Sequence, residues 1–499
     1  MEARPQDGAC PDGRLRVLLL VHRFLPKHVG GAEIIAYEAA RALARSHEVC
    51  VAYPEQVSMP SYESWDIAED YVGEIPVRRL LCAPPDLKDA AARHNIFNPG
   101  AINALRACLE EFQPDIVHIH SLGRLSAGAV WELKARDLPI VMTLHDFWFL
   151  CTRYHLVNID GQLCSGPKGG WQCLLSECFD YIGDRFDPFE DQRTHGGEDD
   201  AADGRRVEPG RPPAAWHRLR GLPKPLRAMV PSALKERVKQ HHAATPSPQQ
   251  APVPTPIWLP RLRYEMMLET LSEVDLLISP SRFLMDRLLA FGVPRERIRF
   301  LPNGIPENRF RDVRKGPRDR IVFGYLGSLD PKKGVHDLIT AFNGIRPEEA
   351  RCLVAGAIQG EYAERLRAMS INPSVSFVGG LTPDRVPEFY SSIDVLVLPS
   401  LCHENSPVTI HEAYYTRTPV IAVRAGGMAE LVQHGRTGFL YQRGDPTDLR
   451  SCIRRFVEEP SLVHEFAARV PEEPTVEEVV QTLESWYRAL LGGTLRDNA

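Results

Sequence analysis

The segment IDVLVLPSLCHENSPVTIHEA, residues 393–413, contains a short apolar run, a polar loop and the start of a helix. Its first part, Ile393–Pro399, contains the continuous apolar run Val395–Leu398, which is typical of a parallel strand that is buried on both faces. Ser406 followed by Pro407 is typical of a helix N-cap with proline at the first helical position. The segment therefore predicts a strand–loop–helix unit, the repeating element of doubly wound α/β domains.

Similar apolar runs recur along the chain and are separated by helix-length amphipathic stretches. The runs are Leu15–Val21, Glu48–Tyr53, Asp115–His120, Pro139–His145, Val274–Ser279, Arg320–Gly327, Arg351–Gly356, Ser374–Val378, Ile393–Pro399 and Pro419–Val423. Five of them precede residue 300 and five follow residue 319. We therefore expect two separate parallel sheets, joined by a linker through Phe300–Asp319 that is rich in turn-forming residues.

The expected first domain comprises residues 1–187 and 261–305, and the expected second domain comprises residues 306–472. Residues 188–260 hold 13 of the 42 prolines, so we expect a Pro-rich, partly disordered insertion. Its basic stretch, 211–242, contains a helix pattern, Ala233–His242, that Ser232 could cap. This stretch either contacts an anionic membrane surface or is a solvated insertion. Residues 473–499 contain a further helical pattern, Thr475–Leu491.

The overall composition excludes several classes of protein. The chain has 499 residues and a formal charge of −6, and 43% of its residues are hydrophobic, which is an ordinary globular composition. The charge disfavours a nucleic-acid partner, and no apolar run approaches the roughly 20 residues that span a bilayer. No cleavable signal is visible, and 11 cysteines are too few for a secreted disulfide scaffold, so we expect a cytoplasmic protein.

Three segments are candidates for binding an anionic ligand. Gly30 and Gly31 follow the first strand, where backbone N–H groups could approach a phosphate, although a tight turn explains the pair equally well. This is not the G-x-G-x-x-G pattern of dinucleotide-binding proteins. Lys333 precedes the helix that follows Arg320–Gly327 and could neutralise a phosphate, or could be a solvated loop lysine.

The third segment is the loop and helix start of residues 403–413. The first N–H groups of the expected helix would be free to bind an anion. Glu404 lies before the helix start, and Glu412 lies five residues after Pro407, about 7.5 Å along the helix axis from it. Two glutamates at this spacing often occur by chance, but their position around a helix start after a strand favours a ligand site.

Through these and further motifs, the chain resembles glycosyltransferase family 4, the retaining enzymes of the GT-B fold. The matching stretches are Gly30–Glu33, Ile278–Ser281, Pro302–Ile305, Gly327–Gly334, Glu404-x7-Glu412 and Gly426–Glu430. The resemblance implies two Rossmann-like doubly wound domains that face a cleft, with a C-terminal helix that returns to the first domain. It also implies transfer of a sugar from a nucleoside-diphosphate-sugar donor to a hydroxyl acceptor, in glycan, polysaccharide or glycolipid biosynthesis.

The resemblance assigns roles to individual residues. Glu412 would bind the ribose hydroxyls, Glu404 the hydroxyls of the donor sugar, and Lys333 and the Gly31 N–H the diphosphate. The full donor-binding set is Gly30, Gly31, Ser328, Lys333, Glu404, Asn405, Ser406, Pro407, Val408 and Glu412.

Two positions depart from the family pattern. Many members have arginine where Ser328 stands, so one expected diphosphate cation is missing, and Lys332 or Arg424 are possible substitutes. Many members have glycine where Asn405 stands.

His145, Glu404 and Lys333 are the candidate catalytic residues. The family places a histidine like His145 beside the reacting sugar, while a lone histidine at a strand end is often only structural; His120 is a lesser candidate. The implied mechanism is a front-face displacement without a protein nucleophile, in which Lys333 and N–H groups stabilise the leaving diphosphate. No D-x-D motif follows a strand, so we expect a metal-independent enzyme without a cofactor.

Three alternatives remain open. Cys151, Cys164, Cys173 and Cys178 could form a structural zinc site, although their spacing is irregular and a structural loop is the other interpretation. The chain could also be a GT-B nucleotide-sugar epimerase, which needs no acceptor. Finally, it could be a catalytically inactive GT-B binding protein, which the serine at position 328 would allow.

Overall fold

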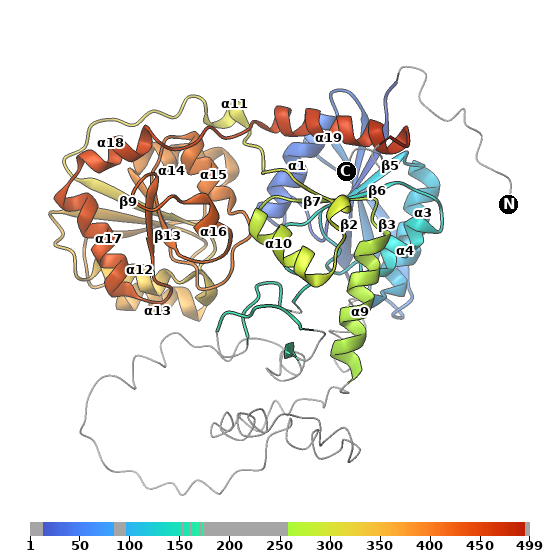
Figure 1. The fold of residues 1–499 in the computed structure, drawn as a ribbon, viewed down its shortest axis with the longest axis horizontal. Coiled ribbons are helices and arrows are strands. Elements are labelled where there is room, and N and C mark those ends of the chain that lie inside the picture. The colour runs from blue at the N-terminus through green and yellow to red at the C-terminus, as the bar shows by residue number, and fades with distance from the viewer. Residues whose placement is uncertain are drawn as a thin grey trace, which may run out of the picture.

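The computed structural model describes residues 13–83, 96–151, 153–158, 162–168, 172–173 and 258–494. Two α/β lobes lie side by side in Figure 1, with the C-terminal lobe in yellow to red and the N-terminal lobe mostly in blue to green. The predicted helix Ala233–His242 lies outside the described residues, as does the predicted insertion up to residue 257. Within the part that is described, no helix is long and apolar enough to cross a membrane.

The N-terminal lobe is built on an eight-stranded sheet in the order β3-β4-β2-β1-β5-β6-β7-β8. The strands are β1 (Arg16–Leu20), β2 (Glu48–Gln56), β3 (Trp65–Val72), β4 (Ile75–Cys82), β5 (Ile116–Ile119), β6 (Ile140–Thr143), β7 (Leu276–Ser279) and β8 (Ile298–Phe300). The five predicted strands are present as β1, β2, β5, β6 and β7, and the sheet also contains β3, β4 and β8, which were not predicted. β3 is antiparallel to β4 at the sheet edge, and none of its residues is fully buried.

The C-terminal lobe has six parallel strands in the order β11-β10-β9-β12-β13-β14, the arrangement of a doubly wound Rossmann sheet. They are β9 (Ile321–Leu326), β10 (Ala350–Ala355), β11 (Val375–Gly379), β12 (Val395–Leu398), β13 (Val420–Val423) and β14 (Gly438–Tyr441). β14 was not predicted. Its four residues are buried, but the run is too short to stand out from the surrounding loop.

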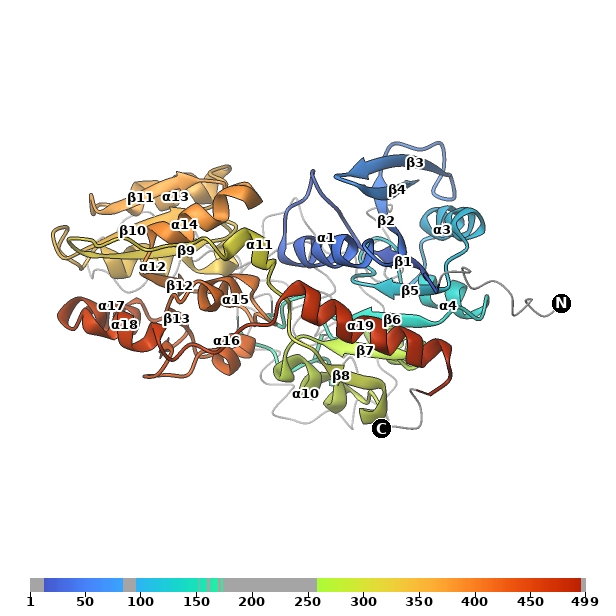
Figure 2. The same cartoon turned by 90° about the horizontal axis from the view of Figure 1, so that it is seen from above.

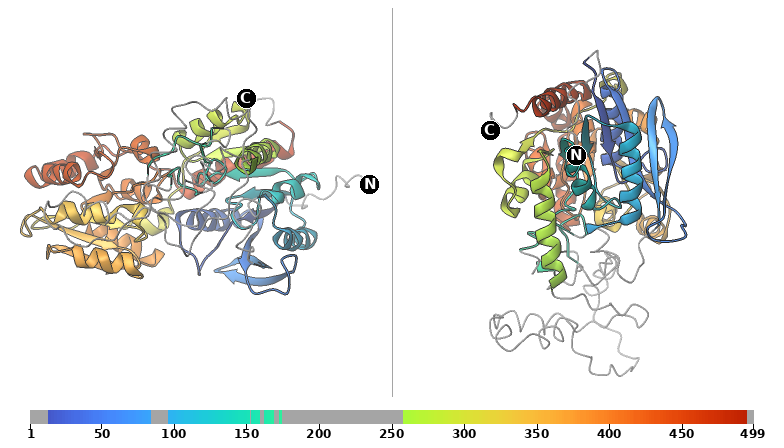
Figure 3. Two further views of the ribbon diagram at one scale, coloured as in Figure 1. Left: turned by 90° about the horizontal axis from the view of Figure 1, so that it is seen from below. Right: turned by 90° about the vertical axis from the view of Figure 1, so that its right-hand side faces the viewer.

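Helices cover both sheets, and each lobe has its own apolar core (Figures 2 and 3). The N-terminal lobe carries α1 (Gly31–Leu43), α3 (Pro99–Phe112), α4 (Gly128–Lys134), α9 (Trp258–Glu273) and α10 (Arg282–Phe291). The C-terminal lobe carries α11 (Glu307–Phe310), α12 (Val335–Phe342), α13 (Glu361–Met369), α14 (Val386–Ser392), α15 (Val408–Tyr415), α16 (Gly426–Leu431), α17 (Pro446–Glu458) and α18 (Ser461–Ala467).

The last helix, α19 (Val476–Leu491), crosses back onto the N-terminal lobe, as Figure 2 shows. Thr475 and Glu478 form a capping box at its start, and its apolar face joins the core around β1 and α1. The chain therefore crosses between the lobes twice, and the two crossings are hydrogen-bonded: Ile305 N donates to Pro474 O (2.8 Å) and Val476 N donates to Ile305 O (3.0 Å). The prediction of a returning terminal helix is confirmed.

The carboxyl ends of strands from the two sheets face each other. Asn405, after β12, donates through Nδ2 to the carbonyl oxygen of Leu144, after β6, at 3.0 Å. The carboxylate of Glu430 in α16 accepts from the N–H groups of Arg282 and Phe283, both at 2.9 Å, and so caps α10 of the other lobe. Ligands of open parallel sheets bind at these carboxyl ends, so this face is where the site is expected.

Candidate active site

Lys333 and Glu404 form an ion pair at the carboxyl edge of the C-terminal sheet. Lys333 lies in a single 3₁₀ turn after β9, and Glu404 lies in the loop after β12. Lys333 Nζ is 2.6 Å from Glu404 Oε1, and Ser400 Oγ donates to the same oxygen at 2.6 Å. All the hydrogen bonds that the described residues make to this carboxylate fall on Oε1, which leaves Oε2 for a ligand.

The ion pair fixes the charge of both groups. Burial alone would raise the pKa of Glu404, but the charge of Lys333 and the hydrogen bonds from Lys333 and Ser400 lower that pKa to about 2. Burial opposes the charge on Lys333, but Glu404 raises the pKa of Lys333 above its usual range. The site therefore presents a fixed cation beside a fixed anion, which suits an anionic group next to a hydroxyl-bearing group.

The helix that follows begins differently from the sequence prediction. Pro407 is the N-cap, with ψ at 117°, and α15 starts at Val408. The prediction of Ser406 as the cap was wrong, because Ser406 Oγ is 2.7 Å from His411 Nε2, whose Nδ1 is 2.6 Å from the Glu473 carboxylate. The first backbone bond runs from Ile410 N to Pro407 O (2.9 Å), so the amides before it have no acceptor in this turn.

Glu412 lies inside α15 and is 5% exposed. Its Oε2 accepts from the hydroxyl of Tyr390 in α14 at 3.0 Å. Burial raises the pKa of Glu412 to about 7, although the Tyr390 bond partly opposes this. The Tyr390 hydrogen bond does not offset the cost of burying this carboxylate, and such a strongly raised pKa is typical of a functional site.

The glycine pair of the first lobe lies against the start of α15. Gly30 is the N-cap of α1, and Gly31 is its first residue. A Cβ at Gly31 would come within 3.3 Å of Val408 Cγ2, so the two helix starts approach closely. Ser328 follows β9, and its carbonyl accepts from the Tyr325 hydroxyl at 2.7 Å.

Glycine is needed at positions 426 and 427, where the start of α16 packs against the backbone of the Glu404 loop. Gly427 N donates to Glu404 O at 2.8 Å, and a Cβ on Gly427 would overlap the carbonyl of Asn405. The Gly426-Gly427 pair therefore lets α16 approach the backbone of the Glu404 loop.

Three stacked histidines lead from the terminal helix to the candidate His145. Tyr487 Oη in α19 is 2.5 Å from His118 Nδ1, and His118 Nε2 is 2.8 Å from Thr143 Oγ1. The His118 and His120 rings stack, and His120 Nδ1 is 2.9 Å from His145 Nε2. His120, predicted as a lesser candidate, thus contacts His145 directly.

Burial determines the charge of these imidazoles. It lowers the pKa of His145 to about 4 and, together with His145, lowers the pKa of His118 to about 3. His145 is therefore neutral at physiological pH, when it can donate from one nitrogen and accept at the other.

Several polar side chains near His145 were missed by the sequence analysis. Asp146 follows it, and burial raises the pKa of Asp146 to about 6. Glu33 in α1 is buried, and its Oε1 is 3.5 Å from His22 Nε2. Arg23 and Arg124 extend the set from the loops after β1 and β5. Glu33 belongs to the Gly30–Glu33 stretch but was assigned no role there. Asp146, Arg23 and Arg124 belong to no spacing motif, and the signal for them was a charged residue shortly after a predicted strand.

The predicted cysteine cluster is described only in part. Cys151 and Cys173 are buried, Cys164 is half-buried, and Cys178 lies outside the described residues. Among the described residues no group of three or more histidine, cysteine or carboxylate side chains could hold a metal ion. A zinc site that includes Cys178 stays a prediction.

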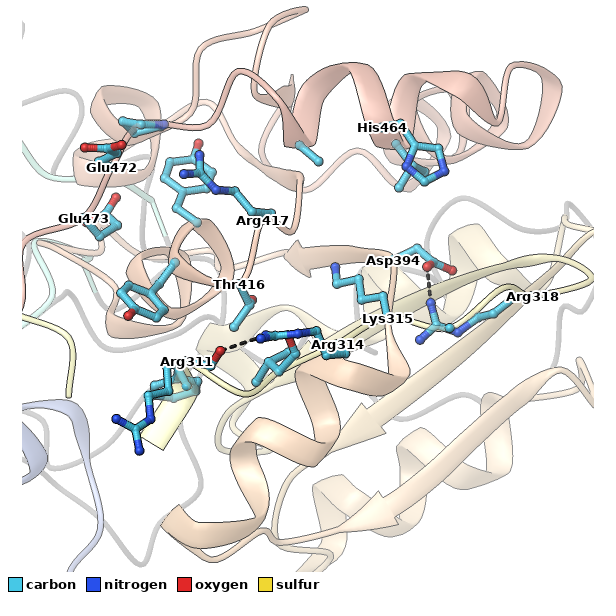
Figure 4. Close-up of a pocket in the computed structure, with 18 of the residues that line it drawn as sticks. Arg311, Arg314, Lys315, Arg318, Asp394, Thr416, Arg417, His464, Glu472 and Glu473 are labelled. Atoms are coloured by element: carbon cyan, nitrogen blue, oxygen red, sulfur yellow. Dashed lines mark hydrogen bonds and ion pairs between the residues drawn. The ribbon is translucent and has the colours of Figure 1, made fainter. Parts of the chain in front are cut away.

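A cavity of about 1080 Å³ lies elsewhere in the C-terminal lobe, and Figure 4 shows its lining. Arg314, Lys315, Arg318 and Arg417 line it, together with Asp394 at the amino end of β12. Because ligands of this fold bind at the carboxyl ends of the strands, this cavity is not part of the candidate active site.

Comparison with known proteins places the architecture in a class. Over 96% of this chain and 99% of the other, the fold matches sucrose-phosphate synthase from Thermosynechococcus elongatus, with a TM-score of 0.61 and 17% identity. It also matches Anabaena HepE in complex with UDP and glucose, with a TM-score of 0.58 and 16% identity, over 95% of this chain and all of the other. Two facing Rossmann-like lobes with a crossing terminal helix define the GT-B fold.

Family models then identify the chain. Residues 29–165 match the model "Glycosyltransferase Family 4", and residues 307–473 match the model "Glycosyl transferases group 1". The chain belongs to glycosyltransferase family 4.

Curated relatives match a smaller part of the chain. A GDP-mannose-dependent alpha-(1-6)-phosphatidylinositol monomannoside mannosyltransferase of Mycobacterium tuberculosis is 32% identical over 30% of this chain and 44% of its own length. A D-inositol 3-phosphate glycosyltransferase of Acidothermus cellulolyticus is 30% identical over 34% of this chain and 42% of its own length. The chain spans less than half of the length of these relatives.

Proposed function

We propose that this protein is a retaining glycosyltransferase that moves a sugar from a nucleoside-diphosphate-sugar donor to a hydroxyl acceptor, in the synthesis of a glycan, polysaccharide or glycolipid. The Lys333–Glu404 ion pair, placed at the carboxyl edge directly before the free amides of α15, is the observation that carries this proposal. The similarity to a GDP-mannose-dependent mannosyltransferase of Mycobacterium tuberculosis supports a nucleotide-sugar donor.

The chemistry follows from these groups. Lys333 has three N–H donors, one of which is used by Glu404, so the others can bind the donor diphosphate. The Val408 and Thr409 amides point from the same helix start, where the helix dipole also favours an anion. Glu404 Oε2 would accept from a sugar hydroxyl, and Glu412 from the ribose.

In the transfer step the bond from the anomeric carbon to the diphosphate breaks, and the acceptor oxygen bonds to the same face of the sugar. The acceptor proton passes to the departing phosphate oxygen, so no protein base is consumed. Lys333 and the α15 amides stabilise the growing negative charge on the diphosphate. Neutral His145 orients the sugar and acceptor by hydrogen bonds rather than by charge.

A thermal-shift panel of UDP-, GDP- and ADP-sugars selects the donor, and an acceptor screen with that donor tests transfer. Nucleoside diphosphate should be released only when an acceptor is present, which an epimerase would not require. Glu404→Ala should lower turnover by about 100-fold or more, while the exposed control Glu364→Gln keeps it. Acceptor-independent epimerisation, or unchanged turnover in Glu404→Ala, would refute the proposal.

The cellular place of the reaction is also proposed: the cytoplasm, with peripheral contact to the inner face of the membrane through the basic stretch 211–242. Seven lysines and arginines lie between residues 218 and 239, with Glu236 as the acid among them. Liposome co-sedimentation of the wild type and of a 211–242 deletion tests this contact. Equal pelleting of both proteins would contradict it.

A further inference from the structure

Two arginines of the N-terminal lobe lie at neighbouring strand ends. β1 and β5 are paired in register, with Leu20 opposite Ile119, so the loops that follow them emerge together. Arg23 lies in the first loop and Arg124 in the second. The loops pack closely, because a Cβ on Gly123 would lie 3.2 Å from His22 Cβ.

The structure holds Arg124 firmly. Its backbone adopts φ = 67°, a conformation that side-chain-bearing residues rarely take. Asn98 Nδ2 donates to the Arg124 carbonyl at 2.8 Å, while Asn98 Oδ1 accepts from Ala101 N at the start of α3. A strained residue that its surroundings fix in this way is common at binding sites.

Neither guanidinium group makes a hydrogen bond or an ion pair within the part of the chain that the structure describes. Both side chains are half-buried, and the Nε atom of Arg23 is fully buried without a hydrogen bond. Burial and the nearby charge of Arg23 both lower the pKa of Arg124, yet an arginine keeps its charge in proteins. Two neighbouring, partly desolvated cations without an ion-pair partner are costly unless an anion binds between them.

The carboxylates in this region do not neutralise the pair. Glu33 lies within electrostatic reach of Arg23, but burial is the larger effect and raises the pKa of the Glu33 carboxyl. The Oε1 atom of Glu33 is 3.5 Å from Nε2 of His22, an imidazole whose lowered pKa leaves it neutral at physiological pH. Glu55 is held by Lys27 at 2.6 Å and by Arg79 at 3.0 Å. The space between the two arginines therefore keeps a positive potential.

This positive region adjoins the candidate catalytic histidine. Burial is the largest cause that lowers the pKa of His22 to about 4, and Arg23, Arg124 and His145 contribute through their proximity. His22 thus lies within electrostatic reach of both arginines and of His145, on the lobe opposite the Lys333–Glu404 pair.

We propose that Arg23 and Arg124 form an anion subsite that binds a phosphate group on the acceptor and so holds the acceptor hydroxyl beside His145. The subsite rests on the proposed function, since it is an acceptor site only if sugar transfer occurs. Two guanidinium forks suit a tetrahedral phosphate better than a carboxylate, because the phosphate offers more acceptor oxygens in more directions. The phosphate belongs either to a soluble phosphate ester or to a lipid headgroup.

Two binding measurements distinguish these sources. Calorimetric titration with sn-glycerol 3-phosphate, with glycerol as the blank, probes a soluble ester. Co-sedimentation with phosphatidylcholine vesicles that contain phosphatidic acid, against pure phosphatidylcholine, probes a headgroup. We expect Arg23→Gln and Arg124→Gln each to weaken binding about tenfold or more in at least one measurement. Arg106→Gln, which removes an exposed α3 cation, should leave both unchanged.

Arg23→Lys keeps the charge but loses the planar fork, so it should weaken phosphate binding to an intermediate degree. It also serves as a control in case the glutamine variants misfold. With any acceptor that supports turnover, the glutamine variants should raise the acceptor KM about tenfold and leave the donor KM within about twofold. Phosphate binding that is absent in both measurements, or that both glutamine variants retain, overturns the subsite. Donor binding is measured separately with the nucleotide-sugar panel, so a failure of the transferase proposal is recognised independently.

Discussion

Asn405 Nδ2 donates a hydrogen bond to the carbonyl oxygen of Leu144 across the lobe boundary, at 3.0 Å. Asn405 directly follows Glu404, and Leu144 directly precedes His145. The bond therefore fixes the candidate donor loop relative to the candidate catalytic histidine. Ser281 Oγ donates to the Asn405 side-chain oxygen, so this amide is held at both ends.

Replacing this amide should therefore impair catalysis more than folding. Asn405→Ala leaves the Leu144 carbonyl and the Ser281 hydroxyl without their partner, at a cost of about 1–3 kcal/mol in the free energy of unfolding. We expect kcat to fall at least about tenfold because the two arms of the site lose their relative placement. Urea denaturation and steady-state kinetics measure the two effects.

Asn343→Ala is the matched control, because Asn343 Nδ2 bonds to the Met369 carbonyl (2.8 Å) within the C-terminal lobe. It should lose similar stability and keep kcat. If Asn405→Ala loses stability but retains full kcat, the interlobe bond has no role in catalysis.

Glu412 should make the protein less stable as the pH rises. Its pKa is about 7 in the folded state against an ordinary 4.5, so between these values the folded protein binds a proton that the unfolded chain has lost. The free energy of unfolding then decreases with pH across that window, by up to about 3 kcal/mol. Glu412→Gln should flatten this slope and raise stability at pH 8 while weakening donor binding.

Urea denaturation of the wild type, Glu412→Gln and the exposed control Glu388→Gln at pH 5, 6, 7 and 8 measures the slopes. If the free energy of unfolding of Glu412→Gln decreased as steeply with pH as that of the wild type, another group would be responsible for the pH dependence.

The Lys333–Glu404 pair should be strongly coupled. Glu404→Gln or Lys333→Met leaves one half-buried charge unpaired, at about 3–5 kcal/mol each, whereas the double variant should cost less than the sum of the two. Because the Glu404 pKa is lowered to about 2, its stabilising effect is present above pH 4.5 and is lost as the pH falls towards 2. A double-mutant cycle by urea denaturation at pH 7 tests the coupling, and additive losses would refute it.

The terminal helix should influence the active site through Tyr487. Tyr487→Phe removes the bond to His118, and we expect about 1 kcal/mol of lost stability together with a fall in kcat. Tyr414→Phe removes a hydroxyl that is hydrogen-bonded within the C-terminal lobe, so it should lower the stability and leave kcat unchanged. An unchanged kcat in Tyr487→Phe would limit α19 to packing.

Removal of divalent metal should not stop transfer, because Lys333 and the α15 amides supply the positive potential for the diphosphate. We expect the same initial rate before and after dialysis against EDTA, within about twofold. A loss of activity that Mg²⁺ or Mn²⁺ restores would contradict this.

The buried parallel strands could be predicted from the sequence because both of their faces are apolar, as in Val395–Leu398. β3 escaped prediction since its edge position leaves Asp66, Glu69 and Asp70 exposed, so no buried pattern marks it. The prediction placed the helix start one residue before Val408, because Ser406, which resembled a cap, bonds instead to His411 in the first turns of the helix.

The donor-side residues could be predicted from the family resemblance, because their motif, Glu404 to Glu412, is contiguous in the sequence. Arg23 and Arg124 could not be predicted together, because they are distant in sequence and their loops become neighbours only through the pairing of β1 with β5. The contact of His120 with His145 likewise depends on the pairing of β5 with β6.

The most direct test of this account is calorimetric titration of the donor selected by the nucleotide-sugar panel into the wild type and Lys333→Met. If the Lys333 ammonium binds the donor diphosphate, the variant should bind about 30-fold or more weakly, while the exposed-charge control Arg346→Gln binds as the wild type does. Equal donor affinity in Lys333→Met and wild type would contradict the central claim.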